Sequence, residues 1–187
     1  MRTETPVKAS TVVFVTPNQI IQRLRYFYFD QDRIYRKYEL TGCLDGELER
    51  MSTNLQIYLE QDAVFLNETD CNLQVCEVGY HYLRKDFSKI LVEFMIYSKR
   101  YKIHLPTNEI KMETELENAP YPCYSVWHFP GEVLAVESRM RNTIKGNRVL
   151  LRTTQGEWIG GDERFEFHFD PYENSKILFG KAILLSE

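Results

Sequence analysis

The chain has 187 residues and a formal net charge of −4, with 43% hydrophobic and 27% charged residues. These proportions are typical of a folded globular protein and exclude a wholly disordered chain. The acidic excess argues against nucleic acid as a partner of the protein as a whole. No stretch approaches the ~18 apolar residues that a membrane span needs.

The N-terminus and the cysteines together predict a cytoplasmic protein. The first residues lack a positively charged segment followed by a long apolar core, so they do not predict a signal peptide. The four cysteines are therefore expected to be free thiols in a reducing compartment. Cys71 and Cys76 lie five residues apart, which is the wrong spacing for a zinc knuckle, so no metal site is predicted from them.

The first elements of the chain predict a strand and then a helix. Residues 1–11 are expected to lack fixed structure, and the β-branched run 12–15 is typical of a strand. Thr16, Pro17 and Gln19 then form the pattern of a helix start, with a capping hydroxyl, a proline in the first turn and a capping box. Apolar residues at helical spacing follow, so a helix is predicted at residues 17–29.

Two interpretations remain for the next segment. The helix continues through residues 34–38 and ends at Gly42, or it breaks at residues 30–32 and residues 33–41 form a strand. The second interpretation is favoured because residues 44–47, Leu-Asp-Gly-Glu, resemble a hairpin turn that needs a strand before it.

The rest of the chain reads as short strands separated by turn signals. Gly79 lies inside one of these strands, where an isolated glycine often marks a bulge. The aromatic content of 13% also favours strands. The expected strands are residues 55–60, 63–67, 73–83, 90–105, 109–116, 123–129, 132–142, 148–154, 165–169 and 177–185.

This pattern predicts one mainly β domain over residues 1–187. Roughly ten strands with one N-terminal helix fit an antiparallel β-barrel or a two-sheet sandwich. No repeat or linker divides the chain.

A first candidate site is a weave of cations and aromatic residues. Aromatic faces stack on planar ligands while arginines bind phosphate or carboxylate. The competing interpretation is an amphipathic element whose aromatics face the core. The residues are Arg23, Arg25, Tyr26, Tyr28, Arg33, Tyr35, Arg36, Lys37 and Tyr38, with a second cluster at Lys99, Arg100, Tyr101 and Lys102.

A second candidate is the polar face of the strand at residues 165–169. Glu166, His168 and Asp170 alternate with phenylalanines, so all three point the same way. Such a row is competent in acid–base catalysis or metal binding, although a solvated sheet face is the commoner arrangement. The histidines, at positions 81, 104, 128 and 168, each fall on a different predicted strand, so a barrel would allow some of them to converge in its interior.

A third candidate is the interior of a barrel, which at this strand count encloses room for one small ligand. The lining would include Trp127 and Trp158, and an arginine would bind an acidic group. The arginine candidates are Arg139, Arg141, Arg148 and Arg152. Further candidates for the lining are Tyr124, Phe129, Met95 and Met140.

The preferred function is a non-catalytic small-molecule-binding protein. Its ligand is expected to be apolar or planar with an acidic group, with delivery to a partner protein as one use. One alternative is a protein-interaction or assembly factor without a ligand. Another is a pocket enzyme, of lyase or isomerase type, that uses Glu166, His168 and an arginine. No cofactor is indicated, because no phosphate loop or nucleophile elbow occurs.

Overall fold

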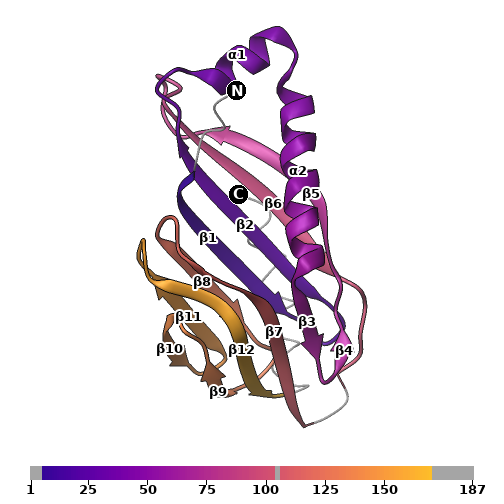
Figure 1. The fold of residues 1–187 in the computed structure, drawn as a ribbon. Coiled ribbons are helices and arrows are strands. Elements are labelled where there is room, and N and C mark those ends of the chain that lie inside the picture. The colour runs from indigo at the N-terminus through magenta and orange to yellow at the C-terminus, as the bar shows by residue number, and fades with distance from the viewer. Residues whose placement is uncertain (1–5, 104–105, 170–187) are drawn as a thin grey trace.

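The computed structural model describes residues 6–103 and 106–169, which form two helices and twelve strands (Figure 1). The helices are α1 (Ile34–Thr41) and α2 (Leu44–Gln61). The strands are β1 (Pro6–Val15), β2 (Ile20–Phe29), β3 (Ala63–Leu66), β4 (Thr69–Asp70), β5 (Leu73–Tyr82), β6 (Lys89–Ser98), β7 (Thr107–Asn118), β8 (Cys123–His128), β9 (Val133–Glu137), β10 (Arg141–Lys145), β11 (Arg148–Thr153) and β12 (Trp158–His168).

The strands form two sheets, and neither closes into a barrel among the described residues. One sheet has seven strands in the order β10-β11-β8-β1-β2-β6-β5, and the other has five in the order β4-β3-β7-β12-β9. All neighbouring pairs are antiparallel except β1 and β8, which are parallel. The predicted sandwich is therefore confirmed, and the barrel alternative is wrong.

The helix predicted at residues 17–29 is also wrong, because this segment is a turn followed by β2. The Thr16 hydroxyl accepts a hydrogen bond from the Gln19 amide at 3.0 Å, which is the bond that the capping interpretation expected. The Thr16 amide, however, donates to the Gln19 carbonyl at 2.9 Å, so the same residues close a β-hairpin. Strand β1 begins at Pro6, so residues 6–11 are ordered in a strand as well.

The strands predicted at residues 33–41 and 55–60 are instead parts of α1 and α2. The carboxylate of Asp30 accepts hydrogen bonds from the backbone amides of Ile34 and Tyr35, at 2.7 and 3.0 Å, and so caps the start of α1. Gly42 ends α1 in the left-handed conformation, with φ at 69°. The segment 44–47 is the first turn of α2 and not a hairpin turn.

The later strand predictions agree with the structure except in their ends. The predicted strand at 90–105 ends at Ser98, and the one at 132–142 is divided into β9 and β10. The bulge in β5 lies between Val75 and Glu77 and not at Gly79. Strand β12 begins at Trp158, seven residues before the predicted strand at 165–169, and the strand predicted at 177–185 lies outside the described residues.

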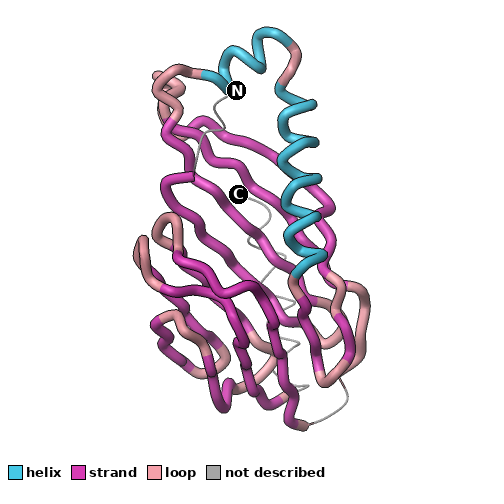
Figure 2. The backbone as a smooth tube through the Cα atoms, viewed as in Figure 1, coloured by secondary structure: helices cyan, strands magenta, loops and turns pink. Residues whose placement is uncertain are grey.

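One face of the seven-stranded sheet, here called the inner face, is covered by the helices and by the five-stranded sheet. The helices lie at one end and along one side of the molecule, while strands make up the rest (Figure 2). Helix α2 packs over the β5 end of this sheet, and the five-stranded sheet packs over the β8 and β11 end. Because one continuous sheet joins both parts, the described residues form one compact domain.

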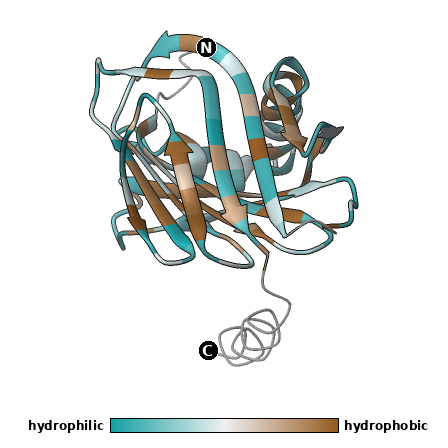
Figure 3. Ribbon diagram, turned by 90° about the horizontal axis from the view of Figure 1, so that it is seen from below, coloured by the Kyte–Doolittle hydropathy of each residue, from teal (hydrophilic) through white to brown (hydrophobic). Residues whose placement is uncertain are grey.

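Each layer contact has its own core, and apolar and polar residues alternate along the strands (Figure 3). Between the sheets, Trp127 stacks on Phe165 with ring centroids 4.6 Å apart. Under α2, the core contains Leu44 and Leu48 from the helix and Phe94 from the sheet. No helix among the described residues is long and apolar enough to cross a membrane.

Candidate functional site

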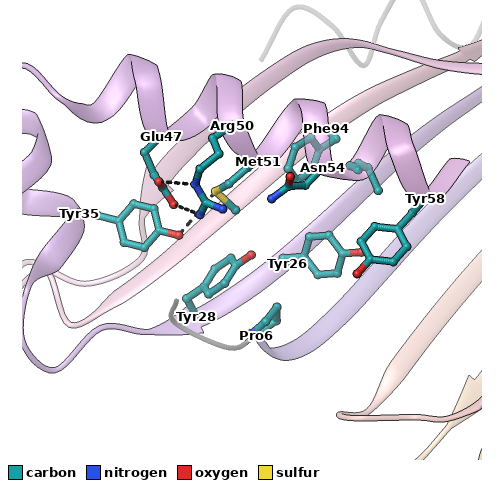
Figure 4. Close-up of a pocket in the computed structure, with 11 residues that line it drawn as sticks. Pro6, Tyr26, Tyr28, Tyr35, Glu47, Arg50, Met51, Asn54, Tyr58 and Phe94 are labelled. Atoms are coloured by element: carbon teal, nitrogen blue, oxygen red, sulfur yellow. Dashed lines mark hydrogen bonds and ion pairs between the residues drawn. The ribbon is translucent and has the colours of Figure 1, made fainter. Parts of the chain in front are cut away.

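A cleft of about 350 Å³ lies between α2 and the inner face of the seven-stranded sheet (Figure 4). Its walls come from α1, α2, β1, β2 and β6, so segments far apart in the sequence meet in it. The lining residues are Pro6, Tyr26, Tyr28, Tyr35, Glu47, Arg50, Met51, Asn54, Leu55, Tyr58 and Phe94.

Two periodicities bring these side chains together. In β2, the residues with even numbers face inward, so Tyr26 and Tyr28 reach the same wall of the cleft. In α2, spacings of three and four residues place Glu47, Met51 and Tyr58 along one side of the helix. The cleft is therefore a consequence of one helix lying across a strand that exposes alternate tyrosines.

Tyr28 differs from the other lining residues because its ring is buried while its hydroxyl faces the cleft. Its relative exposure is 6%, and its ring packs against that of Tyr35 with centroids 5.9 Å apart. The hydroxyl points into the cleft and forms no hydrogen bond with another residue in the described part of the chain (Figure 4). Burial raises the pKa of Tyr28, so the phenol stays protonated and remains a hydrogen-bond donor.

Arg50 is the cation that lines the cleft, and Glu47, which also lines it, offsets its charge. The carboxylate of Glu47 accepts two hydrogen bonds from its guanidinium, at 2.6 and 2.9 Å, across one turn of α2. This bidentate pair holds the guanidinium above Tyr28, and the Tyr35 hydroxyl points toward it (Figure 4). The Tyr35 hydroxyl also lies 3.7 Å from the Met51 sulfur.

The other end of the cleft is also lined by tyrosines. Burial raises the pKa of Tyr26 to about 12, while a hydrogen bond with Tyr121 partly opposes that rise. Tyr58 is 66% exposed and forms the rim. The cleft thus combines flat aromatic surface with hydroxyl and guanidinium donors, a set of groups suited to a planar ligand that carries acceptor oxygens.

The six ligand-binding residues predicted from the sequence do not line this cleft. Trp127 is buried between the two sheets, and Trp158 is 54% exposed on β12. Arg139 lies between β9 and β10, with its Nε close to Gly161. The structure does bring three of the predicted arginines together, on the face of the seven-stranded sheet opposite the cleft. They are Arg141, Arg148 and Arg152.

The residues suggested for catalysis lie on β12 at the surface of the five-stranded sheet. Glu166 forms an ion pair with Arg164 at 2.8 Å, and His168 is exposed at the end of the strand. Asp170 and His104 lie outside the described residues. Within the ranges that the structure describes, no cluster of three or more histidine, cysteine or acidic residues is arranged to hold a metal ion.

The first candidate site, the mixed cations and aromatic residues at positions 23–38, is divided between the two faces of the seven-stranded sheet. Tyr26, Tyr28 and Tyr35 point into the cleft, whereas Arg23 and Arg25 point to the opposite face of the sheet and pair with Glu93. The aromatic half of the pattern therefore contributes to the candidate site, and those two arginines do not.

The residues that α2 contributes to the cleft were missed, because this segment was interpreted as a turn and a strand. The signal that would have found the helix is the apolar spacing of Leu44, Leu48, Met51, Leu55 and Leu59, which repeats every three or four residues. Comparison of the chain with known protein families and with curated proteins found no match.

Proposed function

We propose that this protein is a non-catalytic small-molecule-binding protein whose ligand occupies the cleft between α2 and the seven-stranded sheet. The ligand has a planar or apolar body and an acidic group. The four cysteines, which are free thiols, fit a cytoplasmic location.

The observation that carries the proposal is the Tyr28 hydroxyl. Among the described residues, every buried side-chain nitrogen or oxygen has a hydrogen-bond partner, so the Tyr28 hydroxyl, which bonds to no described residue, is open to water. Tyr28 is 6% exposed, and the open side of its hydroxyl is the cleft. A ligand with an acceptor oxygen would take the place of water at this hydroxyl and accept its hydrogen bond.

The chemistry of the walls indicates the class of ligand. The phenols of Tyr26 and Tyr28 stay protonated at neutral pH and donate hydrogen bonds. Arg50 adds guanidinium donors next to them, so a carboxylate or sulfonate placed there accepts from both. The rings of Tyr26, Tyr28 and Phe94 offer flat apolar surface for the rest of the molecule.

The size of the cleft agrees with this class. Pockets for small organic molecules range over about 300–1,000 Å³, and this cleft of about 350 Å³ lies at the lower end. It fits a compact ligand of two or three rings and not an extended polymer.

The proposal is tested with 1-anilinonaphthalene-8-sulfonate, a planar aromatic anion whose fluorescence rises in apolar sites. We expect saturable binding to the folded protein. Tyr28→Phe is expected to weaken it about fivefold to tenfold through loss of one hydrogen bond. Arg50→Gln is expected to weaken it at least tenfold through loss of a charge-assisted bond.

Two matched variants serve as controls. Tyr97→Phe removes a hydroxyl on the opposite face of the sheet, and Arg36→Gln breaks the equivalent ion pair with Glu39 on α1. Neither should change probe affinity by more than twofold. Equal losses in the cleft variants and the controls, or no saturable binding, would contradict the proposal.

A further inference from the structure

The seven-stranded sheet has a second, uncovered face, here called the outer face. Helix α2 and the five-stranded sheet both pack on the inner face, so no described helix or strand covers the outer one. Pairing registers place alternate residues of β10, β11, β8, β1 and β2 side by side on it. These five strands are neighbours in the sheet, in the order β10-β11-β8-β1-β2, so their outward positions are continuous with one another.

The charge of this surface is opposite to that of the protein. The outward positions of these five strands hold seven lysines and arginines and no aspartate or glutamate. Three of the seven form ion pairs with acids outside these strands: Arg23 and Arg25 with Glu93 of the neighbouring β6, and Arg141 with Glu157. With a net charge of −4 for the whole chain, the rest of the sequence carries −4 − 7 = −11. The seven cations are Lys8, Arg23, Arg25, Arg141, Lys145, Arg148 and Arg152.

Several of these cations are placed against one another. Arg141 is directly opposite Arg152 across the β10–β11 pair, and Lys145 is directly opposite Arg148. Like charges in facing positions destabilise a sheet. Lys145, Arg148 and Arg152 form no ion pair with any other residue in the described ranges. This arrangement leaves positive charge for an external anion to neutralise.

Aromatic rings lie between the cations. Tyr124 is 39% exposed, and the Lys8 ammonium lies 4.9 Å from its ring centroid. The same ammonium lies 5.2 Å from the Phe27 ring. Phe14 and His128 stack on each other, with centroids 4.8 Å apart. The surface therefore offers both positive charge and ring faces within a few strands.

We propose that the outer face of β10, β11, β8, β1 and β2 binds single-stranded nucleic acid. The cations meet the phosphates, and exposed rings such as Tyr124 stack on bases. A broad sheet face does not enter a duplex groove but accommodates an extended single strand, as sheet-based RNA-binding domains do. An acidic polypeptide would match the charge but would leave the rings without planar partners. This inference does not rest on the cleft, which lies on the other face.

The test measures fluorescence anisotropy of two labelled 20-nucleotide probes, oligodeoxythymidylate and oligouridylate, from 50 to 300 mM salt. Binding of either probe is expected, with affinity that falls as salt rises. Arg148→Gln with Arg152→Gln should lower the affinity at least tenfold. It should also make the slope of log K against log salt shallower by about 1.4, because each phosphate contact in a single strand contributes about 0.7.

The ring contribution is tested separately. Tyr124→Ala should weaken binding about fivefold or more through loss of one stacked base. The control is Lys37→Gln with Lys85→Gln, two exposed cations away from the outer face, which should change the affinity less than twofold. Thermal unfolding of each variant verifies that it is folded.

Three results would overturn the inference. The first is the absence of binding of both probes at 50 mM salt, and the second is an equal loss in the control pair. The third is poly-L-glutamate binding as tightly as the probes while Tyr124→Ala has no effect, which would assign the face to an acidic protein.

Discussion

The Tyr28 hydroxyl shows how a single group separates stability from function. It is nearly buried, it points into the cleft, and no described residue accepts its hydrogen bond. In the absence of ligand, this hydroxyl is open to water in the cleft, so it adds little to the free energy of unfolding. A ligand in the cleft would take the place of that water.

Tyr28→Phe is accordingly expected to leave the ligand-free protein as stable as the wild type or to raise its free energy of unfolding by about 0.5–1 kcal/mol. Urea unfolding monitored by circular dichroism measures the change. Tyr97→Phe on the outer face should stay within about 0.5 kcal/mol of the wild type. A loss of 1 kcal/mol or more in Tyr28→Phe would show that the hydroxyl has a structural bond.

Glu163 gives the stability of the protein a pH dependence. The carboxylate is 7% exposed on the inward side of β12, where it accepts a hydrogen bond from the Ser138 hydroxyl. Burial raises its pKa above the ordinary value of 4.5, although the Ser138 bond opposes that rise. A raised pKa favours the protonated form in the folded state, so this contribution to stability is complete below about pH 4.5 and is lost as the pH rises through the folded-state pKa.

Glu163→Gln keeps an acceptor for Ser138 and removes the titrating group. The variant should gain stability relative to the wild type as the pH rises from 4 to 8. Unfolding free energies measured at each pH test this expectation. A difference that stays constant over the range would mean that the pKa of Glu163 is not raised in the folded protein.

At the scale of elements, the bulge in β12 fixes how the five-stranded sheet is assembled. The register between β12 and β7 shifts between Ile159 and Gly161, and Gly160 has a φ of 77°. A Cβ on Gly160 would lie 2.1 Å from the Glu115 carbonyl oxygen, so only glycine allows β7 to approach this closely.

Gly160→Ala is therefore expected to destabilise the protein by about 3 kcal/mol or more, because it adds a backbone clash to the strain of a left-handed conformation. Gly146→Ala is the matched control. Gly146 also has a positive φ, of 59°, but a Cβ there would meet nothing within 4 Å. Its cost should be only about 1–2 kcal/mol. Equal losses of thermal stability in the two variants would remove the close approach as the cause.

The elements that the sequence mispredicted share one physical reason. The Thr16–Gln19 bond forms in the same way in a helix start and in a hairpin turn, so this local pattern does not distinguish the two. The residues that β2 buries on one face, Ile20, Leu24 and Tyr28, are four residues apart, a spacing that fits one side of a helix and one face of a strand alike. Most of the strands after α2 were predictable because they depend on local conformation, whereas the turn signal at residues 44–47 was wrong.

The cleft could not be predicted, because its walls belong to elements paired by the whole topology. Tyr28 and Arg50 come together only once α2 lies across β2, and nothing local to either residue encodes that crossing. The positive face has the same origin. Its cations are distributed over five strands of a chain whose net charge is −4, and only the pairing registers show that they lie side by side.

At the scale of the molecule, one sheet separates two surfaces of different chemistry. The inner face carries the layers that enclose the cleft, and the outer face carries the cations. A small ligand and a polyanion would therefore bind independently. Variants of Tyr28 or Arg50 are expected to leave oligonucleotide affinity within twofold of the wild type, measured by anisotropy. Variants of Arg148 or Arg152 should leave affinity for the aromatic sulfonate probe in the same range.

The most direct test of the cleft is an NMR titration of protein labelled with ¹³C on its methionine methyl groups. Met51 lines the cleft, Met95 lies on the outer face, and Met112 and Met140 pack against the core between the sheets. Adding 1-anilinonaphthalene-8-sulfonate should shift the Met51 signal in a saturable way and leave the signals of Met95, Met112 and Met140 in place. A saturable shift at any of those three with none at Met51 would place the ligand elsewhere and contradict the proposed function.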